Sequence, residues 1–357
     1  MIFYSVKEIA AMLLAAMALD LLIGDPRRLV HPVVVIGRWI RLWERRLLDV
    51  PQNRATAAAN RSAAAANRSA AGANRSVASA KPTAGAARSL RLKGIVLAAV
   101  TVAASFALMW LVLYAAQRIH PWLGYAVNVW FISTTIAIKG LKDAAYLVYG
   151  ALESGRLDAA RAYAGQIVGR DTERLDEPET VRAAVETVAE NIVDAVVSPL
   201  FYAFLGAAPL AMLYRATNTL DSMVGYRNER YLHFGWASAR WDDAMNWLPA
   251  RLTGLLLVVV AFAGRGWSAR RAYRAVRAFA RLHPSPNSGI PESAVAGALG
   301  IELGGVNTYG GIVSERARMG WPLREKERRD IVSAVRMLYG TSYLIAGGLM
   351  CVLLVRL

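Results

Sequence analysis

The chain has 357 residues, 55% of them hydrophobic, which is more apolar than an ordinary soluble domain. It carries 42 basic and 26 acidic side chains, a formal net charge of +16. Its single cysteine, Cys351, excludes internal disulfides and cysteine-rich zinc sites.

Six apolar segments are candidate membrane helices. The longest, Gly94–Gln117, is uninterrupted and long enough to cross a bilayer. The others are shorter or interrupted: Ile9–Ile23, Ala126–Ile138, Pro199–Tyr214, Leu252–Gly264 and Thr341–Val355. We therefore expect an all-α, polytopic integral membrane protein with about four to six apolar helices. One membrane domain would span residues 1–357, with the lipid bilayer as its partner and no nucleic acid.

The first segment is expected to be a retained helix. Asp20 interrupts its apolar run, and no small-residue cleavage pattern follows.

Basic residues give the orientation. Arg27 to Arg46 contains six arginines and one acid, and Pro51 to Leu92 contains seven basic residues and no acid. The positive-inside rule places both stretches in the cytoplasm. If Gly94–Gln117 crosses outward and Ala126–Ile138 returns, the polar segments that follow begin on the cytoplasmic side of the cell membrane.

Residues 51–92 contain a low-complexity, basic insertion. The pair Asn-Arg recurs every seven residues, at 53, 60, 67 and 74, in an alanine-rich background. A coiled coil of that period needs larger apolar side chains. We interpret the segment as a linker within the domain.

Three carboxylates at spacing four follow in a largely apolar segment. Glu186, Glu190 and Asp194 would lie near one face of a helix, where like charges cost stability. Such a stripe indicates a metal, a cationic substrate or a basic partner, and oxygen ligands of this kind suit Mg²⁺. A structural network of ion pairs with nearby arginines is the alternative.

Pro199–Tyr214 decides the topology around these carboxylates. Its centre, Gly206-Ala-Ala-Pro209, favours a re-entrant hairpin over a full crossing. A hairpin would keep Asn218 and Asp221 on the same side as Glu190. Further along the chain, Asp242 or Asp243 with Asn246 forms another oxygen pair at helical spacing.

Two glycine-containing loops lie near the C-terminus. Ser285–Gly289 precedes a helix expected to start near Pro291, so its free backbone N–H groups form a candidate phosphate cradle. Gly304–Gly311 is expected to be a second flexible loop. Neither loop is a Walker A sequence.

The same region opens with an arginine-rich helix, expected over residues 265–281. Its arginines at 270, 274, 277 and 281 share one face, which we interpret as positive-inside placement in the cytoplasm.

Several motifs in fixed order resemble the CobD/CbiB family, the adenosylcobinamide-phosphate synthases of cobalamin biosynthesis. The motifs are Leu19–Pro26 with His31-Pro32-Val33, Val168–Thr172, Glu186–Asn191, Asn218–Ser222, Gly225–Tyr231, Phe234–Ala237, and Ser285–Gly289 with Pro291-Glu292. The resemblance covers nearly the whole chain except an insertion from Arg54 to Arg88, which departs from the family's compact first loop.

The resemblance implies an ATP- and Mg²⁺-dependent ligase. It would join the corrinoid adenosylcobyric acid to (R)-1-amino-2-propanol phosphate, or a related amino-alcohol phosphate, through an acyl phosphate. The alternative is a non-catalytic membrane transporter or signalling protein of the same fold.

On this hypothesis the site residues take three roles. The catalytic residues are Glu186, Glu190, Asp194 and Asp221. The metal ligands are Glu190, Asp194, Asp242 and Asp243. The residues that bind substrate or phosphate are Arg170, Asp171, Asn191, Asn218, Arg227, Asn228, Arg251, Ser285, Asn287, Ser288 and Gly289.

Overall fold

The computed structural model describes residues 4–24, 31–48, 83–226 and 228–355. The chain forms two compact units. The larger unit comprises Met1–His31, Ser105–Arg215 and Asp243–Leu357, and the smaller unit comprises Pro32–Ala104 and Ala216–Asp242.

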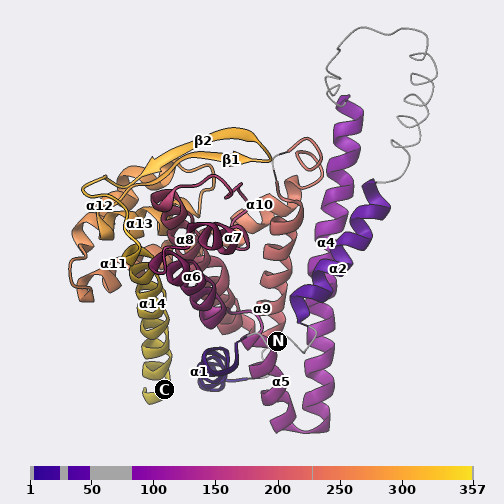
Figure 1. The fold of residues 1–357 in the computed structure, drawn as a ribbon. Helices are drawn as coiled ribbons and strands as arrows, with labels where there is room; N and C mark the ends of the chain where they lie inside the picture. Colours follow the sequence, from indigo (N-terminus) through magenta and orange to yellow (C-terminus); the bar gives the residue numbers. More distant parts are fainter. Residues whose placement is uncertain (1–3, 25–30, 49–82, 227, 356–357) are drawn as a thin grey trace, which may run out of the picture. The chain divides into compact units, whose positions relative to one another are not determined.

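The described chain is mainly helical, with one two-stranded sheet (Figure 1). Its helices are α1 (Val6–Ile23), α2 (Pro32–Leu48), α4 (Ala84–Ile119), α5 (Pro121–Ser133), α6 (Ile138–Glu153), α7 (Leu157–Gly165), α8 (Glu177–Ile192), the π-helix η2 (Val193–Val197), α9 (Ser198–Val224), α10 (Trp236–Met245), α11 (Trp247–Ala263), α12 (Ala269–Phe279), the 3₁₀ helix η3 (Ala280–Leu282), α13 (Gly289–Leu299) and α14 (Arg329–Leu354). The strands are β1 (Leu303–Tyr309) and β2 (Ile312–Met319).

Helix α8 runs through the core of the larger unit. It packs against α6, α7, α13 and α14, and every residue from Thr180 to Ala189 is buried. Asp176 begins the helix by accepting a hydrogen bond from the Glu179 N–H at 2.8 Å, which satisfies one free donor of the first turn. The expected carboxylate stripe therefore lies on a helix with little access to solvent.

The polar residue inside α1 has a structural role. The carboxylate of Asp20 is buried and accepts hydrogen bonds from the N–H groups of Ile138 and Lys139, at 2.9 and 3.1 Å. These groups start α6, where the helix dipole favours a negative charge. Asp20 thus joins α1 to α6 within the larger unit.

The Gly/Pro break expected inside Pro199–Tyr214 is confirmed. Gly206 and Ala207 have non-helical backbone angles within α9, and Ala207 has a positive φ of 53°. The buried side chain of Asn128 on α5 accepts a hydrogen bond from the Ala208 N–H at 3.0 Å, so this freed donor is satisfied. The re-entrant course through the bilayer stays a prediction.

Residues 303–319 form an antiparallel hairpin where the sequence suggested a flexible loop. Gly310 and Gly311 form its turn, and both have positive φ, as a two-residue hairpin requires. Gly304 also has a positive φ, and a Cβ there would lie 2.1 Å from the Ala317 carbonyl oxygen. Glycine–glycine between residues of strand-forming type was the signal for this hairpin.

The smaller unit has its own polar anchor. The carboxylate of Glu44 on α2 accepts hydrogen bonds from Arg230 and Tyr231, both at 2.7 Å. In the same unit, a Cβ on Gly94 would lie 1.8 Å from the Phe234 carbonyl oxygen, so α4 needs glycine at this approach.

The helices confirm an all-α, polytopic membrane protein. All six apolar segments lie largely on helices: α1, α4, α5, α9, α11 and α14. Among the described residues, three helical stretches are long and apolar enough to cross a membrane, or up to four if α10 and α11 form one broken span. The three are Ala84–Ile119, Glu177–Val224 and Arg329–Leu354.

Most of the expected insertion, residues 51–82, lies outside the described residues. At its C-terminal end the chain is already helical, because α4 begins at Ala84, ten residues before the apolar run.

Candidate functional site

Glu186 is surrounded by hydrogen-bond donors inside the larger unit. Its carboxylate lies 2.8 Å from Arg170 Nη1 and 3.3 Å from Arg182 Nη1, and it accepts a hydrogen bond from the Gly304 N–H at 2.7 Å. The residue is only 9% exposed. For Glu186 the structure therefore shows the arginine network that was the alternative to a metal ligand.

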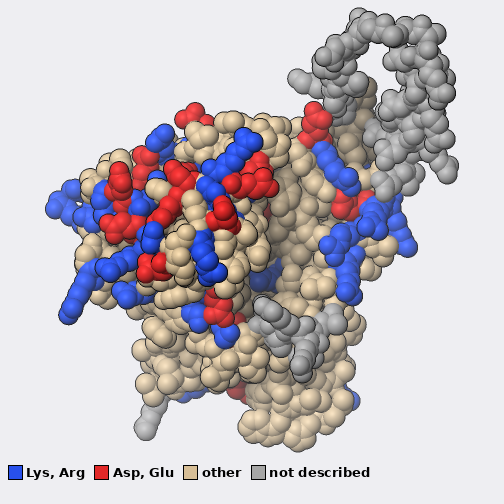
Figure 2. All heavy atoms as spheres, in the orientation of Figure 1, with Lys and Arg blue, Asp and Glu red and all other residues tan. Residues whose placement is uncertain are grey.

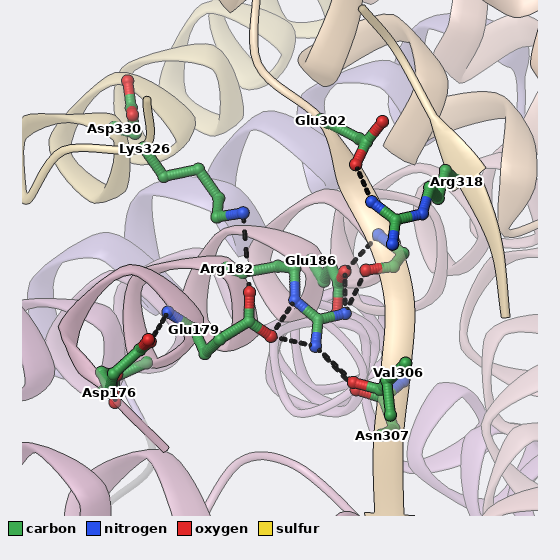
Figure 3. Close-up of polar contacts among 12 residues, drawn as sticks. Asp176, Glu179, Arg182, Glu186, Glu302, Val306, Asn307, Arg318, Lys326 and Asp330 are labelled. Carbon is green, nitrogen blue, oxygen red and sulfur yellow. Dashed lines mark hydrogen bonds and ion pairs between the residues drawn. The ribbon is translucent and has the colours of Figure 1, made fainter. Parts of the chain in front are cut away.

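Arg182 ties α8 to the hairpin and is 1% exposed. Figure 3 shows its guanidinium between Glu179 and Glu186 on one side and strand β1 on the other. It donates to Glu179 at 2.8 Å, to the Val306 carbonyl at 2.9 Å and to the Asn307 side chain at 2.9 Å. The planar guanidinium group has several N–H donors, so it can contact all of these acceptors at once.

Glu190 lies one turn further along α8 and has different surroundings. It is half-buried, and its carboxylate accepts one hydrogen bond, from Ser288 Oγ at 3.0 Å. Ser288 stands directly before α13, so this contact joins α8 to the Ser285–Gly289 turn. Because its carboxylate accepts one hydrogen bond from the described residues, Glu190 keeps spare acceptor capacity at a partly accessible position.

The Ser285–Gly289 turn is held by its own side chains. Ser285 Oγ accepts from the N–H groups of Asn287 and Ser288, at 3.2 and 3.3 Å. A Cβ on Gly289 would lie 2.4 Å from the Ala280 carbonyl oxygen, so only glycine fits there. Two N–H groups of the expected phosphate cradle are thus already used within the turn.

Asn287 and Arg251 extend this region. Asn287 donates to the Asp243 carbonyl at 2.8 Å and accepts from Arg251 Nη1 at 3.4 Å. Arg251 also donates through Nη1 to the Trp247 carbonyl at 2.6 Å, and its guanidinium lies 4.0 Å from the Trp247 ring centre. In the described chain these contacts use only Nη1, which leaves Nε and Nη2 of Arg251 for another acceptor.

The sequence did not indicate a buried pair near Glu190, formed by His283 and Glu292. His283 Nε2 lies 3.7 Å from Glu292 Oε1, and both side chains are more than nine-tenths buried. Desolvation, and then the charges of Glu186 and Glu190, raise the pKa of Glu292 well above its ordinary value. Burial also lowers the pKa of His283. Glu292 belongs to the motif Ser285–Gly289 with Pro291-Glu292 and His283 lies just before it, but no metal-ligand spacing indicated either residue.

Several donors in this cluster have no hydrogen-bond partner among the described residues. They are Arg170 Nε, His283 Nε2 and Asn307 Nδ2. Buried donors of this kind are rare in native proteins and are common at functional sites.

Asp171 is placed at the hairpin turn. Its carboxylate accepts from the Gly310 and Gly311 N–H groups, at 3.0 and 2.8 Å. These bonds, the one from Gly311 first, lower the pKa of Asp171. The contact gives Asp171 a structural function, and its role in phosphate binding stays a prediction.

Asp194 and Asn191 lie at a change of helix type. Asp194 is in the π-helix η2, which widens the turn and shifts the i, i+4 register assumed from sequence. Asn191 donates to the Thr187 carbonyl at 2.9 Å, within its own helix. Both are half-buried.

The remaining predicted residues belong to the smaller unit or lie outside the described chain. Asn218 and Asp242 are buried, Asp221 is half-buried, and Asn228 accepts from the Tyr231 N–H at 3.0 Å in a local turn. Arg227 lies outside the described residues. Their expected roles stay predictions.

No group of three histidine, cysteine or carboxylate side chains that could hold a metal occurs among the described residues. A Mg²⁺ ion shared with substrate phosphates needs only one or two protein carboxylates. Glu190 with the Ser288 hydroxyl fits such an ion, whereas Glu186 does not, because its oxygens already face three donors.

Comparisons with known proteins give one consistent result. A model of the CobD/Cbib protein family matches residues 13–338. The cobalamin biosynthesis protein CobD of Geobacter metallireducens is 42% identical over 338 residues, which cover 95% of each chain. The cobalamin biosynthesis protein CbiB of Salmonella typhimurium is 42% identical over 332 residues, 92% of each chain. No solved structure matches.

Proposed function

This chain belongs to the CobD/CbiB family, and from that premise we propose that it is an amide-forming ligase of cobalamin biosynthesis. It would join adenosylcobyric acid to (R)-1-amino-2-propanol phosphate, or a related amino-alcohol phosphate, with ATP, at the cytoplasmic face of the cell membrane. The observation that carries the proposal is the contact of half-buried Glu190 with Ser288, near a buried cluster of acidic and basic side chains.

The reaction needs an activated carboxylate. The terminal phosphoryl group of ATP is transferred to the propionate carboxylate of adenosylcobyric acid, giving an acyl phosphate and ADP. The lone pair of the amine then attacks the acyl carbon, the bond from that carbon to the phosphate oxygen breaks, and inorganic phosphate leaves. The attacking nitrogen loses one proton as the amide forms. Phosphoryl transfer mainly requires positioning and charge neutralisation.

Glu190 is suited to the amine. An amine in water is largely protonated, and a carboxylate with spare acceptor capacity can bind the ammonium group or take its proton. The hydrogen bond from Ser288 fixes the orientation of that carboxylate. Buried Glu186 would then support the region through Arg170 and Arg182 without contacting the substrate.

Arg251 and Asn287 are suited to a phosphate. The two unused nitrogens of Arg251 can donate in parallel to phosphate oxygens, the bidentate geometry that arginine favours. In the alternative role for Glu190, its carboxylate and the Ser288 hydroxyl would instead hold a Mg²⁺ ion that neutralises phosphate charge in the same region.

The test is conversion by the purified full chain. It should form adenosylcobinamide phosphate from adenosylcobyric acid, aminopropanol phosphate, ATP and Mg²⁺, with one ADP released per product, as measured by mass spectrometry. Omitting ATP or the amino alcohol should abolish the product. Corrinoid binding without conversion would contradict the proposal and favour a non-catalytic protein.

A further inference from the structure

Helix α12 has one face that packs and one that does not. Ala269, Ala272 and Ala275 are buried, and α12 packs against α13. The approach is close, since a Cβ on Gly297 of α13 would lie 2.5 Å from the Ala275 Cβ. Because the packing face consists of small residues, the longer side chains of α12 lie on its outer side.

The outer side carries unpaired positive charge. Arg270, Arg274 and Arg277 are exposed, and none forms an ion pair with a carboxylate in the described chain. Arg277 donates to the Tyr273 hydroxyl at 3.4 Å, which is a neutral partner. Arg271 differs, because it turns inward and donates to the Gly297 and Ala298 carbonyls, both at 3.2 Å.

These side chains enclose one surface hollow. Its volume is about 540 Å³, it is open to solvent, and its lining consists of Arg270, Tyr273, Arg274, Arg277 and Ala278. Figure 2 shows lysine and arginine side chains over the part of the larger unit where Figure 1 draws α12. Hydrogen-bond donors of the arginine side chains therefore surround a hollow that is large enough for a small ligand.

The position of α12 along the chain indicates that a ligand of this hollow comes from the membrane. Helix α11 is apolar and exposes Leu255, Val259 and Phe262, the last at 79%, as a lipid-facing helix does. It ends at Ala263, and only the short Gly264–Ser268 link separates it from α12. A basic amphipathic helix so close to the end of a membrane helix lies at the level of the lipid headgroups.

We propose that the outer face of α12, formed by Arg270, Tyr273, Arg274 and Arg277, binds the phosphate groups of anionic lipid headgroups. Guanidinium groups donate to phosphate oxygens in pairs, and the hollow between them receives the headgroup. The inference does not depend on the proposed ligase activity, because it rests on α11 and α12 alone.

The experiment measures lipid retention by the full chain in neutral detergent. Phosphatidylglycerol or phosphatidylcholine is titrated and bound lipid is counted by native mass spectrometry. We expect the wild type to retain phosphatidylglycerol preferentially. The combined variant Arg270→Gln, Arg274→Gln, Arg277→Gln should lose this retention by at least about tenfold.

The matched control removes the same three charges elsewhere. Arg156, Arg174 and Arg329 are exposed and form no ion pair in the described chain, so their replacement by glutamine should leave retention unchanged. Single substitutions Arg270→Gln and Arg274→Gln should each lower retention partly, and they serve if the combined variant unfolds.

Three results would overturn the proposal. The first is equal retention of both lipids by the wild type. The second is equal phosphatidylglycerol retention by the wild type and the combined variant. The third is displacement of phosphatidylglycerol by soluble glycerol phosphate at comparable concentration, which would assign the hollow to a free phosphate ester.

Discussion

Glu186 and Glu190 lie one helical turn apart on α8 and have opposite surroundings. Arg170, Arg182 and the Gly304 N–H contact the oxygens of Glu186, whereas in the described part of the chain Glu190 accepts one hydrogen bond, from the Ser288 hydroxyl. The sequence spacing placed both residues on one helix face. Their different contacts, however, depend on the hairpin for Glu186 and on the turn before α13 for Glu190. Gly304 is 118 residues from Glu186 and Ser288 is 98 residues from Glu190, so no local pattern could predict these two contacts.

Glu292 gives a pH-dependent prediction at the same scale. Because burial and the nearby Glu186 and Glu190 raise its pKa in the folded state, the folded protein binds this proton more tightly than the unfolded chain does. Stability is therefore lost as pH rises above the ordinary value near 4.5, by up to about 1.4 kcal/mol per pH unit in that window. Glu292→Gln removes this loss.

Thermal unfolding of the detergent-solubilised protein between pH 4.5 and 8 measures the effect. The variant should gain stability relative to the wild type as pH rises, while the exposed control Glu325→Gln should show a constant difference. His283, Arg170 and Arg316 lie near Glu292 and are unchanged in all three proteins. A constant difference for Glu292→Gln would contradict the raised pKa.

At the scale of elements, the helices were predictable and the details that build the site were not. The apolar runs identified α4 and the break at Gly206, because period and glycine are local signals. The sequence carries no local signal for the π-helix η2, because this widened turn depends on how the helix packs. The hairpin was missed because a glycine-rich stretch was interpreted as a loop.

Arg182 provides the test of the contact between α8 and the hairpin. Arg182→Met keeps much of the side-chain volume but leaves buried Glu186 and half-buried Glu179 with fewer donors. We expect a loss of about 3–5 kcal/mol in unfolding free energy and faster hydrogen exchange in residues 303–319. The exposed control Arg174→Met should change the free energy by less than about 0.5 kcal/mol. Unchanged exchange in the hairpin would contradict the assigned contact.

At the scale of the whole molecule, the chain is a multi-pass membrane protein, and the position of ionisable residues relative to its spans bears on the transporter alternative. A transporter is expected to place such residues in its spans near the midplane. Asp20, the acid inside the first apolar segment, instead caps α6. Asp20 therefore gives the transporter alternative no support, and the proposed ligase reaction rests on the family to which the chain belongs and not on the residues alone.

The orientation can be tested with single cysteines in a Cys351→Ser background. Ser154 lies in the exposed link after α6, on the side expected to be cytoplasmic, and Ile119 is 75% exposed at the end of α4, on the side expected to be external. An impermeant maleimide should label Ile119→Cys in intact cells and Ser154→Cys only in inverted vesicles. The reverse pattern would contradict the positive-inside assignment.

The central claim is that Glu190 acts in amide formation, and turnover of Glu190→Gln tests it most directly. Glutamine keeps the shape and can still accept from Ser288, but it cannot bind an ammonium ion or take its proton as a carboxylate does. Glu173→Gln, at an exposed acid before α8, is the matched control. We predict that Glu190→Gln lowers the rate of adenosylcobinamide phosphate formation at least about a hundredfold with unchanged thermal stability, while Glu173→Gln keeps wild-type turnover. Near-normal turnover of Glu190→Gln would contradict the account.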